Sequence, residues 1–213
     1  SHNIENIVRN HRTLKQRIAQ DGPMRPDELL PILVQVCDAL GAAHVQEVVH
    51  RDLKPENLFL CADGETVKVV DFGLSRLATQ KRMTKTGMMI GTPRYMAPEQ
   101  IRSAKDADAR TDQYALAVIA HEALVGSSPF PAGDAGQLLG CVMSGRVLTL
   151  EEQAPGIPEA VGEVVRRAMS TDPKDRFATI GGFVEAYALA LIHISEPTRL
   201  RRGAYAVVRL KKQ

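Results

Sequence analysis

Three oxygen-bearing side chains lie close together in the first third of the chain. Asp52 and Asn57 belong to the sequence HRDLKPEN at residues 50–57, and Asp71 begins the triplet DFG at residues 71–73. A carboxylate and an amide oxygen together form a hard oxygen site, which suits Mg²⁺ because this ion takes few protein ligands and completes its shell with water or phosphate. Asn57 and Asp71 are therefore candidate Mg²⁺ ligands, and Asp52 can face the hydroxyl group of a substrate.

A β-hairpin is needed to bring the two candidate ligands together. Two short runs of strand-forming residues, at 57–60 and 66–70, flank an Asp-Gly pair of the kind found in hairpin turns. If Gly64 lies at the turn, antiparallel pairing sets Asn57 opposite Asp71 at the open end of the hairpin. The spacing therefore predicts that the amide and the carboxylate are neighbours.

Helices account for most of the remaining pattern. Apolar residues over 27–45 recur at helical spacing, and a second, mostly apolar helix over 111–125 should be buried and stop at Gly126. The segment 71–100 contains several glycines and prolines and is predicted to be a long functional loop. Further helices are expected at 14–18, 135–144, 158–170 and 180–192.

Four motifs in a fixed order resemble those of one enzyme family. They are HRDLKPEN at 50–57, DFG at 71–73, GTPRYMAPE at 91–99, and Arg176 within DPKDRF. Together they resemble the Ser/Thr protein kinases, specifically the eukaryotic-like kinases of bacteria. The resemblance implies the large lobe of a protein kinase, mainly α with a small β-hairpin (α+β), with ATP and Mg²⁺ as cofactors and protein Ser/Thr hydroxyls as substrates.

The resemblance also assigns roles to the reacting groups. Asp52 is expected to be the catalytic base that orients the acceptor hydroxyl, and Lys54 to meet the γ-phosphate. Asn57 and Asp71 are expected to hold Mg²⁺ and, through it, the nucleotide. The alternative is that the two aspartates are ordinary turn or capping residues, which is the usual role of an isolated Asp.

A second set of residues is expected to regulate the enzyme or face its substrate. The guanidinium of Arg51 can pair with a phosphate on the loop that follows, and Thr84 and Thr86 are the candidate phosphorylation sites. The alternative is that both are ordinary loop threonines. By resemblance, Thr92 lies in the substrate-facing segment and marks Ser/Thr specificity.

Further motif residues are expected to support the site structurally. By resemblance, Glu99 and Arg176 form a buried ion pair, and Asp112 holds the backbone of the catalytic loop, residues 50–57. The alternative for the pair is two solvated charges. His44, His121 and His193 have no partner spacing and are predicted to be structural or at the surface. The packing residues around the site are His50, Phe72 and Gly73.

The resemblance covers residues 12–190, the large lobe only, with the small lobe expected to be missing. No Gly-x-Gly-x-x-Gly stretch precedes the catalytic loop, and neither a strand lysine nor its helix glutamate is found there. Residues 1–11 are expected to be a remnant of the small lobe. Because half of the ATP site is absent, we expect the chain by itself neither to bind Mg-ATP tightly nor to transfer phosphate.

The C-terminal segment 191–213 differs from the rest of the chain. It carries six of the 27 Lys and Arg residues, and its first nine residues, LIHISEPTR, resemble a translated sequencing adapter. We therefore expect a non-native or disordered tail. The alternative is a genuine basic segment next to a membrane span.

Composition limits the other classes of partner. Aromatic residues make up 4% of the chain and Trp is absent, so composition does not favour nucleic-acid binding. Three widely spaced cysteines without a CxxC pair favour reduced thiols. We expect no membrane span, because no apolar run reaches the length of about 18 residues that a span needs. The kinase domain is expected to be cytoplasmic, with any membrane anchor in segments absent from this sequence.

Two alternative functions remain. One is a kinase-like scaffold without catalysis, which would have no need to keep Asp52, Lys54, Asn57 and Asp71 all intact. The other is a small-molecule phosphotransferase of kinase-like fold, which would share the Asp and Asn but not Lys54 or Thr92.

Overall fold

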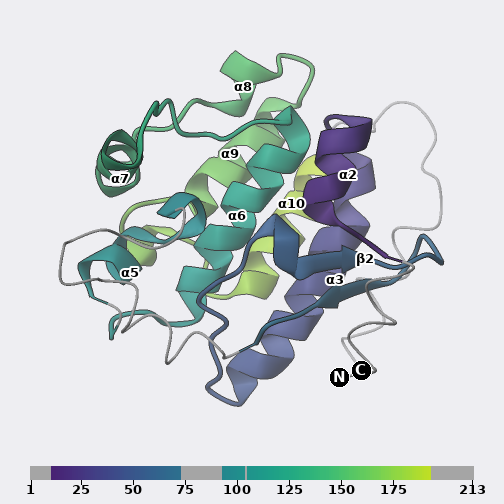
Figure 1. Cartoon of the computed structure of the whole chain (residues 1–213), viewed down its shortest axis with the longest axis horizontal. Helices are drawn as coiled ribbons and strands as arrows, with labels where there is room; N and C mark the ends of the chain where they lie inside the picture. The colour runs from purple at the N-terminus through teal and green to yellow at the C-terminus, as the bar shows by residue number, and fades with distance from the viewer. Residues whose placement is uncertain (1–10, 73–92, 104, 193–213) are drawn as a thin grey trace.

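Helix α6 (Ala109–Val125) lies at the centre of the molecule, between α2 (Leu14–Asp21) on one side and α7 (Ala135–Ser144) on the other (Figure 1). The computed structural model describes residues 11–72, 93–103 and 105–192. Helices α3 (Pro26–Val45) and α9 (Glu159–Ala168) both pack against α6. The architecture is mainly helical with one small antiparallel sheet, as the sequence predicts apart from a third strand.

The central position of α6 follows from its composition. Every residue from 111 to 124 is buried, which is typical of a helix surrounded by other elements. The Asp108 side chain accepts a hydrogen bond from the Arg110 amide at the start of the helix. Gly126 ends the helix in the left-handed conformation, at φ +83°, where its amide donates to the Glu122 carbonyl. The predicted end at Gly126 is confirmed, and the helix starts two residues before the predicted 111.

Helix α3 is the longest helix of the described part of the chain. It packs against α10 (Ile180–Ile192) and α6, and its buried residues Leu29, Leu33, Val36 and Leu40 follow helical spacing. By length and composition alone it could cross a membrane, contrary to the sequence expectation, and 28% of its most apolar window is buried in the fold. The core helix of a globular domain has the same length and composition, so these two properties of α3 are weak evidence for a membrane span.

The sheet contains the predicted hairpin with a different register. Strands β2 (Leu58–Leu60) and β3 (Val67–Val69) pair so that Leu58 faces Val69, which sets Asn57 opposite Val70. The predicted pairing of Asn57 with Asp71 is therefore wrong by one residue. The loop closes by a hydrogen bond from the Cys61 amide to the Thr66 carbonyl, so the turn is centred between residues 63 and 64.

The edges of the sheet are completed from two other elements. Strand β1 (Arg12–Thr13) pairs with β2, and its two residues are too few to show a periodic pattern in the sequence. On the other edge, the Gln35 amide of α3 donates to the Glu65 carbonyl at 2.7 Å and accepts from the Val67 amide at 2.9 Å. One side chain thus fixes the hairpin to α3.

The remaining elements match the sequence prediction with few changes. Helices α7 and α10 have the predicted bounds, α2 runs three residues past the predicted end, and α9 is shorter than predicted at both ends. The segment 71–100, predicted to be a loop, contains regular structure at its end. The elements that the sequence did not predict are η1 (Pro55–Asn57), η2 (Pro93–Tyr95), α5 (Pro98–Arg102), α8 (Leu150–Gln153) and η3 (Pro173–Asp175).

The structure bears on two further predictions, which concern the cysteines and the C-terminal segment. Cys37, Cys61 and Cys141 all lie in the described part of the chain and none of them forms a disulfide. Helix α10 continues to Ile192, so Leu191 and Ile192 belong to the fold although they fall in the range predicted to be a tail. The remainder of that range, and residues 1–10 of the expected small-lobe remnant, lie outside the described residues.

Candidate active site

The catalytic loop 50–57 is fixed by one buried carboxylate. Asp112, in the first turn of α6, is fully buried and accepts hydrogen bonds from the backbone amides of His50 and Arg51, both at 2.9 Å. The exposed amide groups at a helix N-terminus favour a negative charge there. A rigid central helix therefore sets the position of the first two residues of the loop.

His44 is a third partner of Asp112. Its Nε2 lies 2.7 Å from Asp112 Oδ2, and because a carboxylate oxygen can only accept, the imidazole donates. His44 lies in the last turn of α3, so this contact ties α3 to α6 and to the loop. The sequence predicted a structural or surface role for His44 without a partner, since residues 68 positions apart show no local pattern.

The His50 ring joins the loop to the end of β3. Its Nε2 donates to the Val70 carbonyl at 2.9 Å, and its Nδ1 accepts from the Asp52 amide at 3.3 Å. This pair of contacts fits one neutral tautomer, protonated at Nε2. The ring also contacts Phe72, with the ring centres 4.9 Å apart. His50 and Phe72 thus pack together beside Asp52.

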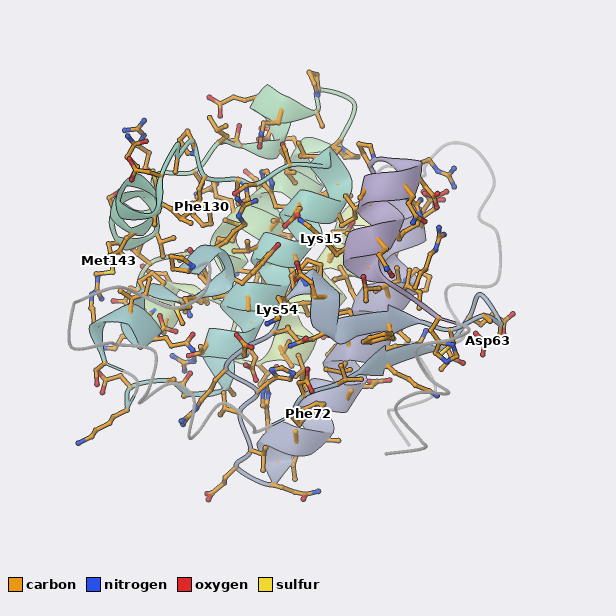
Figure 2. The ribbon with its side chains drawn as sticks, in the orientation of Figure 1. Lys15, Lys54, Asp63, Phe72, Phe130 and Met143 are labelled. Atoms are coloured by element: carbon orange, nitrogen blue, oxygen red, sulfur yellow. The ribbon has the colours of Figure 1, made fainter. Side chains whose placement is uncertain are left out.

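Asp52, Lys54 and Asn57 form a connected group within the loop. Lys54 Nζ lies 3.1 Å from Asp52 Oδ2, and the Asn57 amide donates to the Asp52 carbonyl at 2.9 Å. Asn57 is buried, whereas the side chains of Asp52 and Lys54 remain partly exposed. Lys54 is labelled in Figure 2, beside α6 and above Phe72. The Asn57 hydrogen bond uses the amide nitrogen, so its oxygen is the atom that could ligate a cation.

Asp71 follows directly after the end of the hairpin. The Val70 amide donates to the Asn57 carbonyl at 3.0 Å, so Asp71 is one residue beyond the pair that joins the two strands. Asp71 is exposed and has φ +63°, a left-handed conformation that is uncommon for residues other than Gly. An amide oxygen and an exposed carboxylate at this end of the hairpin fit a Mg²⁺ ion that is shared with phosphate.

No denser metal site competes with this pair in the described part of the chain. Among residues 11–72, 93–103 and 105–192, no group of three or more His, Cys, Asp or Glu side chains gathers closely enough to hold a metal. A site built by one Asn and one Asp would leave most of the metal shell to water and phosphate. That arrangement suits a nucleotide-bound Mg²⁺ ion better than a resident structural metal.

Arg51 has an unusual backbone conformation next to the candidate base. Its φ is +65°, its carbonyl accepts from the Gln100 amide at 2.6 Å, and its guanidinium donates weakly to the Ala107 carbonyl at 3.4 Å. Its Nε is buried, with no hydrogen-bond partner among the described residues. This donor could bind an anion, such as a phosphate, on the loop that follows.

Glu99 and Arg176 form a buried, bidentate ion pair. The guanidinium nitrogens lie 2.7 Å from Glu99 Oε1 and 2.7 Å from Oε2. Thr111 adds a hydrogen bond to Glu99, and Arg176 also donates to the carbonyls of Ser170 and Arg110. The contacts provide partners for both buried charges and join α5, the start of α6 and the segment before α10.

A second buried carboxylate network was missed in the sequence. Glu122, near the end of α6, accepts from Tyr95 Oη and from Lys15 Nζ, each at 2.5 Å. Burial raises the pKa of Tyr95, and the negative charge of Glu122 adds to this effect, so the phenol stays protonated and donates. Glu122 stands in a mostly apolar helix, and its partners come from distant segments, so no local pattern in the sequence signals the network.

Four predicted site residues lie outside the described residues. These are Gly73, Thr84, Thr86 and Thr92. The described chain resumes at Pro93, and the 3-10 turn η2 leads into α5 with its Ala97-Pro98-Glu99 start.

Comparison with known proteins shows the family in which these elements and contacts occur. A family model described as the protein kinase domain matches residues 4–187, so the chain belongs to the protein kinase family. Its curated relatives place it with the bacterial serine/threonine-protein kinases. The chain is thus a protein serine/threonine kinase by family.

Three relatives indicate how far the similarity extends. Serine/threonine-protein kinase PknH of Mycobacterium bovis is 39% identical over 170 residues, covering 80% of this chain and 28% of PknH. Pkn1 of Myxococcus xanthus is 40% identical over 193 residues, covering 87% of this chain and 28% of Pkn1. The crystal structure of the Mycobacterium tuberculosis PknI kinase domain superposes with a TM-score of 0.63 at 26% identity, covering 85% of this chain and 63% of that domain. The chain therefore spans less than a third of the length of these two curated relatives.

Proposed function

We propose that this chain provides the catalytic lobe of a Ser/Thr protein kinase that transfers the γ-phosphate of ATP to protein hydroxyl groups. The observation that carries the proposal is the connected loop in which Asp112 fixes residues 50 and 51 and Asn57 binds the Asp52 carbonyl. A scaffold without catalysis would not need this group of polar side chains facing one site. The kinase domain is proposed to act in the cytoplasm.

In the proposed reaction, Asp52 orients the acceptor hydroxyl for attack on the γ-phosphorus. A bond forms between the acceptor oxygen and phosphorus, the bond to the β,γ-bridging oxygen breaks, and ADP leaves with that oxygen. The hydroxyl proton passes to the Asp52 carboxylate. Lys54, which lies beside Asp52, supplies a positive charge for the phosphoryl oxygens as negative charge shifts among them.

Asn57 and Asp71 are the proposed Mg²⁺ ligands. When bound, the metal neutralises the charge of the phosphates and holds them in line with the acceptor. In this proposal the chain presents Asn57 Oδ1 and the Asp71 carboxylate from the two arms of the hairpin, at its open end. The contacts of His50 with Val70, Phe72 and the Asp52 amide hold these ligands in register with the base.

Regulation is proposed to use the segment that precedes η2. Phosphorylation of Thr84 or Thr86 would place a doubly charged group where Arg51 can bind it, and the buried Arg51 Nε supports this role. Thr92 is proposed to face the substrate, next to the described turn at Pro93. Such a pair would couple phosphorylation of this segment to substrate binding.

We further propose that the chain as given does not transfer phosphate by itself. Its sequence contains no Gly-rich loop before the catalytic loop, and a kinase needs that loop and a strand lysine to hold the nucleotide phosphates. The proposed division is a large lobe at 12–190, a small-lobe remnant at 1–11 and an additional segment at 191–213. The well-packed α10 extends the ordered lobe to residue 192.

Phosphoryl transfer by a chimera tests the function. The chimera joins the N-terminal lobe of PknH to this chain and is incubated with labelled ATP, Mg²⁺ and a generic Ser/Thr protein. We expect transfer that falls about 100-fold or more in Asp52→Asn, because a positioned base contributes about 10²–10⁴ to the rate. The control is Asp106→Asn, which changes an exposed carboxylate and should keep full activity. Equal activity of the two variants would rule out Asp52 as the base.

A further inference from the structure

We propose that Lys15 and Glu122 are positioning residues that couple helix α2 to the segment 93–97. The inference rests on the proposed function and deepens it, because this segment directly follows Thr92, which is proposed to face the substrate. Three elements meet at the Glu122 carboxylate: α2 through Lys15, α6 through Glu122 itself, and η2 through Tyr95. In Figure 2, Lys15 lies where α2 and α6 are side by side.

The geometry makes Glu122 the centre of a chain of hydrogen bonds. Lys15 Nζ lies 2.5 Å from Glu122 Oε1, and Tyr95 Oη lies 2.5 Å from Glu122 Oε2. The Glu122 side chain is only 2% exposed, whereas the Lys15 side chain is 40% exposed. A buried acid is therefore paired with a base that reaches it from the surface.

The position of Glu122 in α6 explains why it needs a cation. Glu122 lies in the last turn, where the unpaired carbonyl groups of a helix disfavour a negative charge. Burial adds a further cost unless the carboxylate is both paired and hydrogen-bonded. The lysine provides the positive charge, and the tyrosine provides the second hydrogen bond.

The hydrogen bond between Tyr95 and Glu122 holds the segment 93–97 to the lobe. Tyr95 lies in η2, which packs against α6 and α7, and its hydroxyl is the group that binds α6. Glu56 of the catalytic loop and Arg94 of η2 also act electrostatically on Tyr95. Loss of the Lys15 charge would leave Glu122 buried without a cation and would loosen its hold on Tyr95.

Amide hydrogen exchange of the whole chain tests the coupling without requiring activity. In Lys15→Met we expect the amides of 93–103 to exchange about tenfold faster than in the original chain, because a buried charge loses its partner. Lys15→Arg, which keeps the charge, should restore the original rate. The controls are Gln20→Met, an exposed change on the same helix, and Lys105→Met, which removes an exposed lysine elsewhere.

A double-mutant comparison separates coupling from general loss of stability. Glu122→Gln keeps an oxygen that accepts from Tyr95 and removes the buried charge, so it no longer needs Lys15. We therefore expect Lys15→Met to speed exchange in 93–103 by less than about twofold when Glu122 is already Gln. An equal effect of Lys15→Met in both backgrounds, or equal exchange in Lys15→Met and Gln20→Met, overturns the proposal.

Kinetics of the chimera then relate the coupling to the reaction. We expect Lys15→Met to raise the KM for the protein substrate about tenfold and to leave the KM for ATP unchanged. If the chimera transfers no phosphate while the exchange results hold, the proposed function fails and the coupling stands. If exchange is unchanged while the chimera is active, the coupling fails and the function stands.

Discussion

The two ends of helix α6 hold buried carboxylates in different ways. At its start, Asp112 binds two backbone amides and His44, in a position where the helix dipole already favours a negative charge. At its end, Glu122 faces the unfavourable pole and is paired with the ammonium of Lys15. The acid at the favourable end of the helix is thus held by two backbone amides and an imidazole, whereas the acid at the unfavourable end is paired with an ammonium group.

This difference separates the two tasks of the lobe. The N-terminal carboxylate fixes the catalytic loop through main-chain donors, which only a substitution by proline would remove. The C-terminal carboxylate depends on one long, partly exposed side chain of α2. We infer that the catalytic loop is the fixed part of the site and that the segment 93–97 is the adjustable part.

The largest effect is expected from removing Arg176, the cation that pairs with the third buried carboxylate, Glu99. Arg176→Met would leave Glu99 buried without its partner, and breaking such a pair costs about 3–5 kcal/mol. We expect this loss in the free energy of unfolding measured with urea. Arg102→Met changes an exposed arginine and should alter that free energy by less than about 0.5 kcal/mol. A loss below 1 kcal/mol in Arg176→Met would show that the pair does not join α5 to the lobe.

The next largest effect is expected at the start of α6. In Asp112→Asn the side chain can accept from one backbone amide only, and its NH₂ group faces the other. An unsatisfied buried donor costs about 1–3 kcal/mol, so we expect about 3 kcal/mol for the combined loss of the carboxylate contacts. Urea unfolding measures it against Asp106→Asn. A cost as small as that of the control would mean that the loop holds its own conformation.

The smallest effect is expected from the histidine that precedes Glu122. Burial lowers the pKa of His121 below its usual 6.5, although its contact with the Leu148 carbonyl and nearby acids oppose the shift. The unfolded chain therefore binds a proton more readily than the folded one, and stability falls as the pH drops below about 6.5.

The matched variant isolates this histidine from the other titrating groups. His121→Gln can still donate to the Leu148 carbonyl but cannot titrate. We expect the urea midpoint to fall less between pH 7.5 and pH 5.5 in His121→Gln than in the original chain. The same fall in both proteins would assign the pH dependence to other groups.

The sequence predicts the elements better than the contacts between them. Strong periodicity and turn residues give the helices over 135–144 and 180–192 and the end of α6 at Gly126. The hairpin is also predicted, but its register depends on where a four-residue loop closes, and one residue of difference moves Asn57 from Asp71 to Val70.

The long-range polar contacts of the site could not be predicted from local pattern. Asp112 and Glu99 stand out because they lie in or near family motifs. His44 and Lys15 do not, since their partners lie 68 and 107 residues away and each is an ordinary residue of an amphipathic helix. A sequence therefore suggests which groups react, whereas the fold shows which groups hold them.

Exchange of the His50 and Arg51 amides is the most direct test of the central claim that Asp112 fixes the catalytic loop. The structure predicts slow exchange of both amides in the original chain and at least about tenfold faster exchange in Asp112→Asn. Fast exchange of these amides in the original chain, or equal rates in the two proteins, would contradict the account.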